Sequence, residues 1–108
     1  MIETMQAVTP SQLVEWRKQG VVHQLIDIRE DYEVETCNIG GTHIPMGEIG
    51  QRLEEVERNI PVVIHCKSGR RSEAVAAHLQ RMGFNNVHTL DGGIMAWIET
   101  IDSNLETY

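Results

Sequence analysis

An uninterrupted apolar run leads directly into a glycine loop and a helical segment near the middle of this chain, in PVVIHCKSGRRSEAVAAHLQRMG. The residues VVIH at 62–65 show no polar alternation, which is typical of a strand buried on both faces of a parallel sheet. Parallel neighbours need crossover connections, and the helix predicted at 72–83 provides one. This segment therefore predicts an α/β fold with a mostly parallel sheet and helices on both faces.

Strand and helix signals alternate from residue 21 to the end of the chain. Strands are predicted within 23–30 and 86–90, a short helix at 30–37 and a final helix at 94–100. Polar and glycine-rich sequence separates these segments, and no internal repeat or linker interrupts them. This order agrees with an α/β domain.

Two further helices are predicted from their end signals and their periodicity. Residues 9–20 carry Thr9 as N-cap, Gln12 in a capping box and Gly20 as terminator. Over residues 47–59, apolar side chains recur at the spacing i, i+4 and i+7, which predicts an amphipathic helix with its acids in solvent. These apolar residues are Ile49, Leu53 and Val56.

The composition is that of an ordinary globular domain. The 108 residues suffice for one hydrophobic core, so a single domain is predicted over 1–108. No apolar run approaches the about 20 residues that cross a bilayer, and the N-terminus lacks the regions of a signal peptide. A cytoplasmic protein without a membrane partner is expected. The net charge of -7 and only nine Lys and Arg argue against nucleic acid as a partner.

The cysteines and histidines limit other kinds of site. Cys37 and Cys66 are too few for a disulfide framework and are expected to be free thiols in a reducing compartment. Cys37 precedes a glycine turn, where it could resolve a persulfide or pack in the core, and packing is preferred. The histidines lack metal-ligand spacing, so no metal and no cofactor are predicted. They are His23, His43, His65, His78 and His88.

The loop CKSGRRS, residues 66–72, is the candidate site. In parallel α/β sheets, ligands bind beyond the carboxyl ends of the strands, where this loop lies. A turn at Gly69 over the N-terminus of the next helix can cradle an anion with backbone N–H groups. Lys67, Arg70 and Arg71 are predicted to make this pocket positive and to lower the pKa of Cys66. The loop therefore predicts a nucleophilic thiolate with an anionic substrate.

Each of these loop residues could instead have an ordinary structural role. Free cysteines are often core residues, but a core cysteine needs no glycine loop with three cations, so the functional interpretation of Cys66 is preferred. Arg70 and Arg71 could be ordinary surface charges, although their position favours contact with an anion. His65 precedes the cysteine, yet adjacent strand residues point to opposite faces. We therefore predict that His65 fills the core and is not a general base.

Four segments resemble the single-domain rhodaneses, or thiosulfate sulfurtransferase-like domains. They are LIDIRE, IGGTHIPMGEI, VVIHCKSGRRS and GFNNVHTLDGGIMAW, in the family's order and spacing. The resemblance covers nearly the whole chain, and CKSGRRS carries most of its specificity. CNIGGTHIPMGEI is most similar to rhodanese domains fused to enzymes that activate sulfur-carrier proteins. The resemblance implies a rhodanese-like fold with a central, parallel, five-stranded sheet and helices on both faces.

The same resemblance implies a ping-pong sulfur transfer. Cys66 would take a sulfane sulfur from thiosulfate or a protein persulfide and pass it to a thiol, cyanide or protein acceptor. It implies supporting roles for Asp27 and Arg29, and a structural turn at 91–93, formed by an aspartate and two glycines, before the last helix. The implied anion- and substrate-binding loop comprises Lys67, Ser68, Gly69, Arg70, Arg71 and Ser72.

Three functions remain open at this point. The first is a sulfurtransferase that uses a small anionic donor such as thiosulfate, and the second is a relay or binding module fed by a cysteine desulfurase or a sulfur-carrier protein. The third is a phosphatase-like hydrolase. Related phosphatases place arginine after five intervening residues, whereas four separate Cys66 from Arg71 here, so Ser72 occupies the phosphatase position. The shorter loop favours sulfur, and the sequence does not separate the first two functions.

Overall fold

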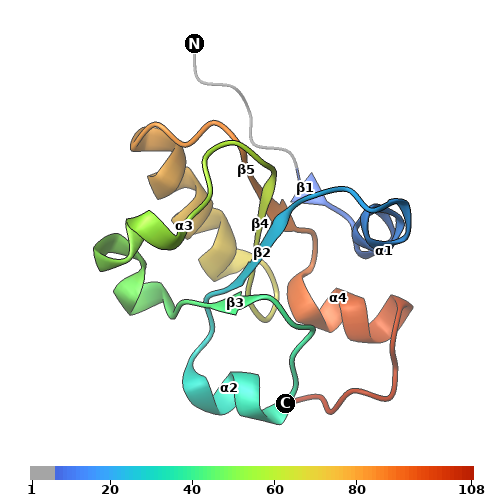
Figure 1. Cartoon of the computed structure of the whole chain (residues 1–108). Helices are drawn as coiled ribbons and strands as arrows, with labels where there is room; N and C mark the ends of the chain where they lie inside the picture. The colour runs from blue at the N-terminus through green and yellow to red at the C-terminus, as the bar shows by residue number, and fades with distance from the viewer. Residues whose placement is uncertain (1–6) are drawn as a thin grey trace.

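Five strands form one sheet in the computed structural model, which describes residues 7–108 (Figure 1). The strand order is β1-β5-β4-β2-β3, and every pairing is parallel. The strands are β1 (Ala7–Val8), β2 (Gln24–Asp27), β3 (Thr42–His43), β4 (Val62–His65) and β5 (Val87–Leu90). The prediction of a five-stranded parallel sheet is confirmed.

Helices connect the strands and cover the sheet. The α-helices are α1 (Pro10–Gln19), α2 (Asp31–Thr36), α3 (Arg70–Arg81) and α4 (Gly93–Thr100). Two 3₁₀ helices, η1 (Met46–Gln51) and η2 (Leu53–Glu55), lie between β3 and β4. Within residues 7–108, none of the helices has the length and apolar character needed to span a membrane.

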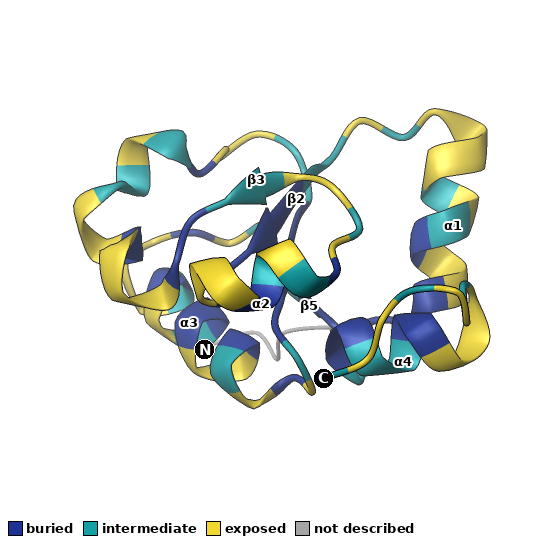
Figure 2. Ribbon diagram, turned by 90° about the horizontal axis from the view of Figure 1, so that it is seen from below, coloured by how far each residue is buried: buried dark blue, intermediate teal, exposed yellow. Residues whose placement is uncertain are grey.

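The central strand β4 is buried on both faces, as its continuous apolar sequence predicts. Val62 and Ile64 belong to a core cluster with residues of α3 and η1. Val63 points to the other face and packs in a cluster with Leu13 of α1 and Trp97 of α4. Helices therefore cover both faces of the sheet, and in Figure 2 α1 and α4 each show a buried and an exposed side.

The helix α1 has the end signals that the sequence predicts. Thr9 Oγ1 accepts a hydrogen bond from the Gln12 backbone N–H at 3.1 Å, and Gln12 Oε1 accepts one from the Thr9 N–H at 2.9 Å. Gly20 ends the helix with a φ of 71°, in the left-handed region. The predicted capping box and terminator are confirmed.

The amphipathic α-helix predicted over 47–59 is wrong. This segment forms η1 and η2, which are separated at Arg52, where φ is -126°. Ile49 and Val56 are buried as their spacing suggests. Gly47 and Gly50 lower the helix propensity of the segment, so short 3₁₀ turns bury the same apolar side chains without a continuous α-helix.

The bounds of α3 differ from the prediction, and the strand β1 was not predicted. The helix α3 spans Arg70–Arg81 and has Gly69 as its N-cap, so it begins and ends two residues earlier than predicted. Both arginines of the loop motif therefore lie in the first turn of a helix. The strand β1 has two residues and pairs with β5, and a segment this short has no periodicity that the sequence could show.

Candidate active site

The loop of residues 66–69 joins β4 to α3 at the carboxyl end of the sheet. Gly69 has a φ of 112°, which a residue with a side chain rarely adopts. The N-terminus of α4 fixes this loop from the other side. The Ile94 N–H donates to the Cys66 carbonyl at 2.9 Å, and the Met95 N–H donates to the Lys67 carbonyl at 3.1 Å. The loop is thus held by two helices.

The turn at 91–93 allows α4 to approach this closely. Gly92 and Gly93 have φ values of 74° and 64°, and a Cβ on Gly93 would clash with the carbonyl groups of Lys67 and Cys66. The Asp91 N–H donates to the Val8 carbonyl at 2.8 Å. These contacts confirm a structural role for the turn.

The Cys66 thiol lies inside the loop and is hydrogen bonded there. Its Sγ accepts from the Gly69 N–H at 3.1 Å, and it lies 3.6 Å from Ser72 Oγ. Beside the neutral thiol, the Ser72 hydroxyl donates to the Gly69 carbonyl at 2.9 Å. Cys66 is only 1% exposed, so a reactant must present a narrow group to the sulfur.

The pKa of Cys66 is lowered, but the leading causes differ from those predicted. Burial raises the pKa of the thiol. The backbone N–H groups of Ser72, Gly69 and Ser68 and the Ser72 side chain stabilise the thiolate and together outweigh burial. The Ser72 hydroxyl donates to the Gly69 carbonyl beside the neutral thiol and can turn to donate to Sγ once the thiol is ionised. The sequence had predicted that the three cations Lys67, Arg70 and Arg71 cause this effect. Hydrogen bonds within residues 66–72 are instead the main cause that lowers the pKa of Cys66.

Arg71 is paired with an acid from another element. Its guanidinium donates two hydrogen bonds to Glu33 of α2, at 2.7 Å and 2.9 Å. The Tyr108 hydroxyl donates to Glu33 Oε2 at 2.8 Å. Arg71 lowers the pKa of Glu33 to about 2, against the opposing effect of burial. The carboxylate therefore stays ionised at neutral pH beside the loop.

The other two cations of the loop differ in their surroundings. Lys67 Nζ lies 4.5 Å from the centroid of the Tyr108 ring, in a cation–π contact. Arg70 is exposed, and no ion pair joins it to any other residue of 7–108. Contact between these cations and a substrate anion stays a prediction.

Asp27 and Arg29 form a buried ion pair behind α2. Arg29 Nη2 lies 2.8 Å from Asp27 Oδ2, and both residues are nearly inaccessible. Burial raises the pKa of Asp27, but hydrogen bonds from Arg29 and the nearby charges lower it overall. Arg29 also donates to the Cys37 carbonyl at 2.7 Å and to the Tyr108 hydroxyl at 2.9 Å. It thereby connects to the loop through Tyr108 and Glu33.

His65 and Cys37 are both core residues. His65 is fully buried, its ring nitrogens have no hydrogen-bond partner within the described chain, and burial lowers its pKa to about 4. The prediction that His65 fills the core is confirmed. Cys37 is a buried free thiol in a cluster with Ile94 and Ile98, in agreement with the packing interpretation.

Two residues of the site, Glu33 and Tyr108, were not predicted from the sequence. Glu33 occupies the N3 position of α2, where its side chain accepts from the Glu30 N–H, and this capping position was its only local signal. Tyr108 lies 75 residues from Glu33 and 79 residues from Arg29 along the chain. No sequence pattern links residues so far apart, so only the fold brings them together.

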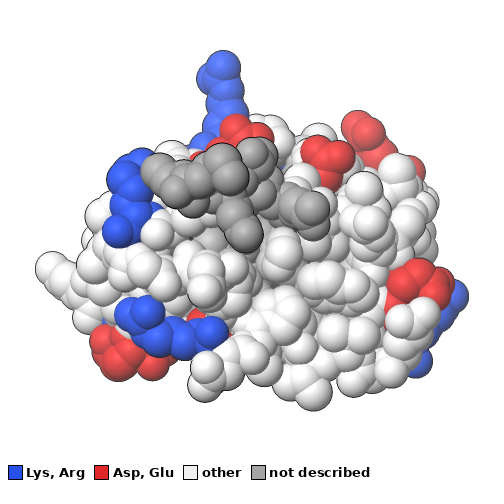
Figure 3. Space-filling model, turned by 90° about the horizontal axis from the view of Figure 1, so that it is seen from above, with Lys and Arg blue, Asp and Glu red and all other residues white. Residues whose placement is uncertain are grey.

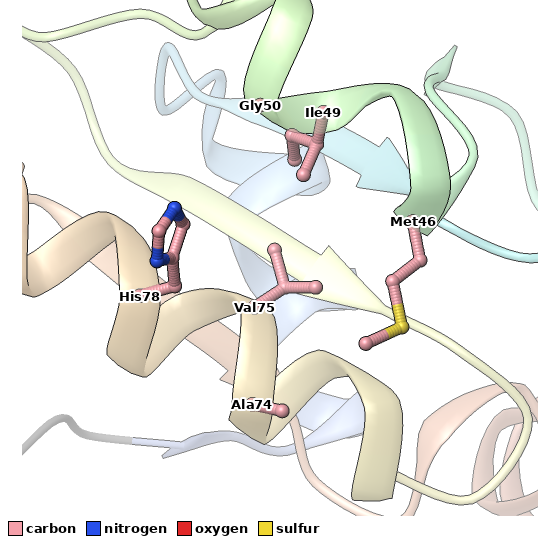
Figure 4. A pocket seen from close by; sticks show the side chains of 6 residues that line it. All are labelled: Met46, Ile49, Gly50, Ala74, Val75 and His78. Carbon is pink, nitrogen blue, oxygen red and sulfur yellow. The ribbon is translucent and has the colours of Figure 1, made fainter.

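An apolar hollow of about 200 Å³ lies between η1 and α3 (Figure 4). Histidine is the only polar side chain among its lining residues, which are Met46, Ile49, Gly50, Ala74, Val75 and His78. The hollow offers no guanidinium or ammonium group, so it is a poor place for an anionic donor. Among residues 7–108, no three side chains of the metal-ligating types come together.

Charges of both signs are interspersed over the face seen in Figure 3. Lys and Arg atoms lie mainly near the margin of the view, and Asp and Glu atoms lie close to several of them. The described residues form no continuous basic patch on this face.

Comparisons with known proteins agree with this geometry. The rhodanese-like domain family matches residues 9–100. The chain is 31% identical over 98 residues to the thiosulfate sulfurtransferase GlpE of Pseudomonas aeruginosa, covering 90% of this chain and 87% of GlpE. It is 32% identical over 104 residues to MoeZ of Mycobacterium tuberculosis, named as a probable adenylyltransferase/sulfurtransferase, covering 94% of this chain but 26% of MoeZ.

A solved structure shows the same fold. A rhodanese-like domain protein from Staphylococcus aureus superposes with a TM-score of 0.82 at 28% identity, covering 96% of this chain and 99% of that protein. The parallel sheet, the loop around Cys66 and these similarities lead to one assignment. The chain belongs to the rhodanese-like family and is an enzyme of the sulfurtransferase type.

Proposed function

We propose that the chain transfers a sulfane sulfur through a persulfide on Cys66, in a ping-pong reaction. The observation that carries this proposal is the hydrogen bonding of the thiol. The Gly69 N–H lies 3.1 Å from Sγ, and the groups around the sulfur lower its pKa. A thiolate is the form that attacks a sulfane sulfur. The loop stabilises that form without a general base.

In the first half-reaction, the Cys66 thiolate attacks the outer sulfur of thiosulfate or of a protein persulfide. The new S–S bond forms as the old one breaks, and sulfite or the donor thiolate leaves with the electron pair. In the second half-reaction, the thiolate of an acceptor, or cyanide, attacks the outer sulfur of the Cys66 persulfide. The Cys66 thiolate leaves, so the enzyme returns to its starting state with no oxidant or reductant consumed.

The loop residues have separate roles in this proposal. The backbone N–H groups from Lys67 to Ser72 hold the thiolate and the anionic part of the donor, and Ser72 also donates its hydroxyl. Arg70 and Arg71 supply positive charge at the start of α3. Asp27 and Arg29 support Glu33 and Tyr108, which contact Arg71 and Lys67.

A protein-fed relay is the second candidate function. The low exposure of Cys66, 1%, and the pairing of Arg71 with Glu33 favour a donor that inserts a narrow persulfide group. A cysteine desulfurase or a sulfur-carrier protein is the corresponding partner. Both candidates need free thiols, and we propose a reducing compartment such as the cytoplasm. The phosphatase-like alternative has less support, because Ser72 stands where the family's phosphatases carry arginine.

Intact-protein mass spectrometry after brief incubation with thiosulfate tests the persulfide. We expect one added sulfur on the wild type and on Cys37→Ser, and none on Cys66→Ser, because a hydroxyl cannot form a persulfide. A gain on Cys66→Ser would refute the proposed nucleophile. No gain on the wild type with thiosulfate, together with a gain after incubation with a persulfide-loaded desulfurase, would select the relay.

A further inference from the structure

The cations that flank Cys66 are held by internal partners. Arg71 is bonded through both terminal nitrogens to Glu33, whose side chain is 4% exposed. Lys67 rests against the Tyr108 ring, and the Tyr108 hydroxyl bonds the same carboxylate. Figure 1 shows the C-terminus beside α2, in agreement with the hydrogen bond between Tyr108 and Glu33.

Arg71 also lies close enough to Cys66 for the two charges to interact. The Glu33 carboxylate raises the pKa of Arg71 most strongly, and the Cys66 thiolate raises it further. The guanidinium therefore interacts with two negative groups of the protein itself, with Glu33 through two hydrogen bonds and with the Cys66 thiolate through the attraction of opposite charges. An anionic donor at the sulfur would be a third negative group for the same cation.

We propose that Glu33 is a specificity-determining residue that competes with anionic donors for Arg71. To bind Arg71 fully, a thiosulfate dianion must displace a buried carboxylate, which would then lose its strongest partner. The sulfane sulfur of a thiol persulfide carries no sulfonate and needs no such exchange. The loop is therefore tuned toward persulfide donors and against small dianions.

Tyr108 strengthens this selectivity in two ways. Its hydroxyl donates a hydrogen bond to Glu33 Oε2 and holds it in place. Its ring makes a cation–π contact with the ammonium group of Lys67. Both contacts reduce the positive charge that the loop can offer to a dianion. This inference deepens the proposed function and rests on it for the identity of the substrate, while its physical basis can be tested without turnover.

The first test compares the alkylation of Cys66 by iodoacetate, an anion, and by iodoacetamide, a neutral analogue. Both reagents need the thiolate, so the ratio of their rates cancels any change in the pKa of Cys66 and reports how the loop accepts an anion. Peptide mass spectrometry separates Cys66 from Cys37. We expect Glu33→Gln to raise the iodoacetate-to-iodoacetamide ratio by about fivefold or more, because one negative charge beside the loop is removed.

Glutamine suits this test because it keeps the shape of Glu33 and the N3 acceptor of the capping box. The matched control is Glu35→Gln, which removes the same charge from an exposed position of the same helix. The control should leave the ratio unchanged. A ratio that is equal to wild type in Glu33→Gln, or that rises equally in Glu35→Gln, would overturn the proposal.

A second variant covers the case in which Glu33→Gln does not fold. Tyr108→Leu removes the hydroxyl from Glu33 and the ring from Lys67, and it should raise the same ratio. An unchanged or lower ratio in folded Tyr108→Leu would then overturn the proposal. The KM for thiosulfate should fall with the rising ratio while kcat changes little, a gain that structural damage would not produce.

Failure of the proposed function would look different. If no sulfur appears on wild-type Cys66 from thiosulfate or from a persulfide donor, the transfer reaction is refuted. The alkylation ratio would still report whether Glu33 excludes anions from the loop. The two claims therefore fail through separate measurements.

Discussion

The Ser72 hydroxyl is the side chain that most directly stabilises the Cys66 thiolate. Among the groups that lower the pKa of Cys66, this hydroxyl comes first, ahead of the backbone N–H groups of the loop. The Ser72 side chain is fully buried, and its hydroxyl donates to the Gly69 carbonyl beside the neutral thiol but can turn to Sγ once the thiol is ionised. One hydroxyl thus connects the geometry of the loop to the reactivity of its cysteine.

We predict that Ser72→Ala raises the pKa of Cys66, because burial then acts with one fewer opposing hydrogen bond. Iodoacetamide alkylation of Cys66 should slow severalfold at neutral pH. The midpoint of the curve of alkylation rate against pH should move to higher pH. Ser68→Ala is the matched control, since Ser68 contributes a backbone N–H that the substitution leaves in place. Equal midpoints for Ser72→Ala and wild type would contradict this role of the hydroxyl.

At the scale of elements, α3 begins with two arginines, at the end of the helix where positive charge is unfavourable. The N-terminus of a helix carries a partial positive charge, so Arg70 and Arg71 oppose the helix dipole. Glu33 from α2 offsets this for Arg71 by a bidentate ion pair. This ion pair therefore ties the start of α3 to α2.

The approach of α4 to the loop gives a prediction about stability. Gly93→Ala should lower the free energy of unfolding by about 3 kcal/mol or more, because the new Cβ meets the Lys67 carbonyl and the φ of 64° is strained. Gly83→Ala is the control, since Gly83 also has a positive φ, 98°, but has open space around it. It should cost about 1 kcal/mol.

Urea denaturation measures both variants. A Gly93→Ala protein as stable as Gly83→Ala would show that α4 can move away from the loop without cost. In Gly93→Ala, Cys66 should also be alkylated more slowly than in wild type, because the carbonyl groups of Cys66 and Lys67 lose the geometry that α4 fixes.

At the scale of the whole molecule, buried ionisable groups make the stability depend on pH. Burial lowers the pKa of His65 in the folded state to about 4, below the ordinary 6.5 of an unfolded chain. As pH falls below 6.5, the unfolded state therefore takes up a proton before the folded state does. The contribution is present above pH 6.5 and is lost progressively down to about pH 4.

We predict a loss of roughly 3 kcal/mol from His65 across this window. Thermal unfolding between pH 4 and 8 should show a steeper decline for wild type than for His65→Leu, which has no proton to bind. His78→Leu, at an exposed position of α3, is the control and should keep the wild-type slope. An equal slope in His65→Leu and wild type would contradict the prediction.

Glu33 extends the acid sensitivity to lower pH. Arg71 holds its pKa at about 2, below the ordinary 4.5, so the folded state favours the ionised carboxylate. This stabilisation is fully present above pH 4.5 and is lost as pH falls toward 2. The steps from His65 and Glu33 should therefore follow one another, and Glu33→Gln should remove only the second in denaturation curves measured from pH 6 to 2.

Features that depend on local chemistry could be predicted from the amino-acid sequence. The apolar run 62–65 indicated a strand buried on both faces, Thr9 and Gln12 indicated the start of α1, and Gly69 indicated the turn under Cys66. These signals lie within a few residues of what they specify, so propensity and periodicity suffice. The prediction of a single domain over 1–108 stays a prediction.

The charges that surround the site depend on the folding of the whole chain. The loop sequence 66–72 contains no acid, whereas the fold brings Glu33 to Arg71 from 38 residues away and Tyr108 from the end of the described chain. The segment 47–59 has helical spacing, but tertiary burial of its apolar side chains is satisfied by short 3₁₀ turns. Contacts between distant segments depend on how the sheet and helices pack, and local sequence carries no record of that packing.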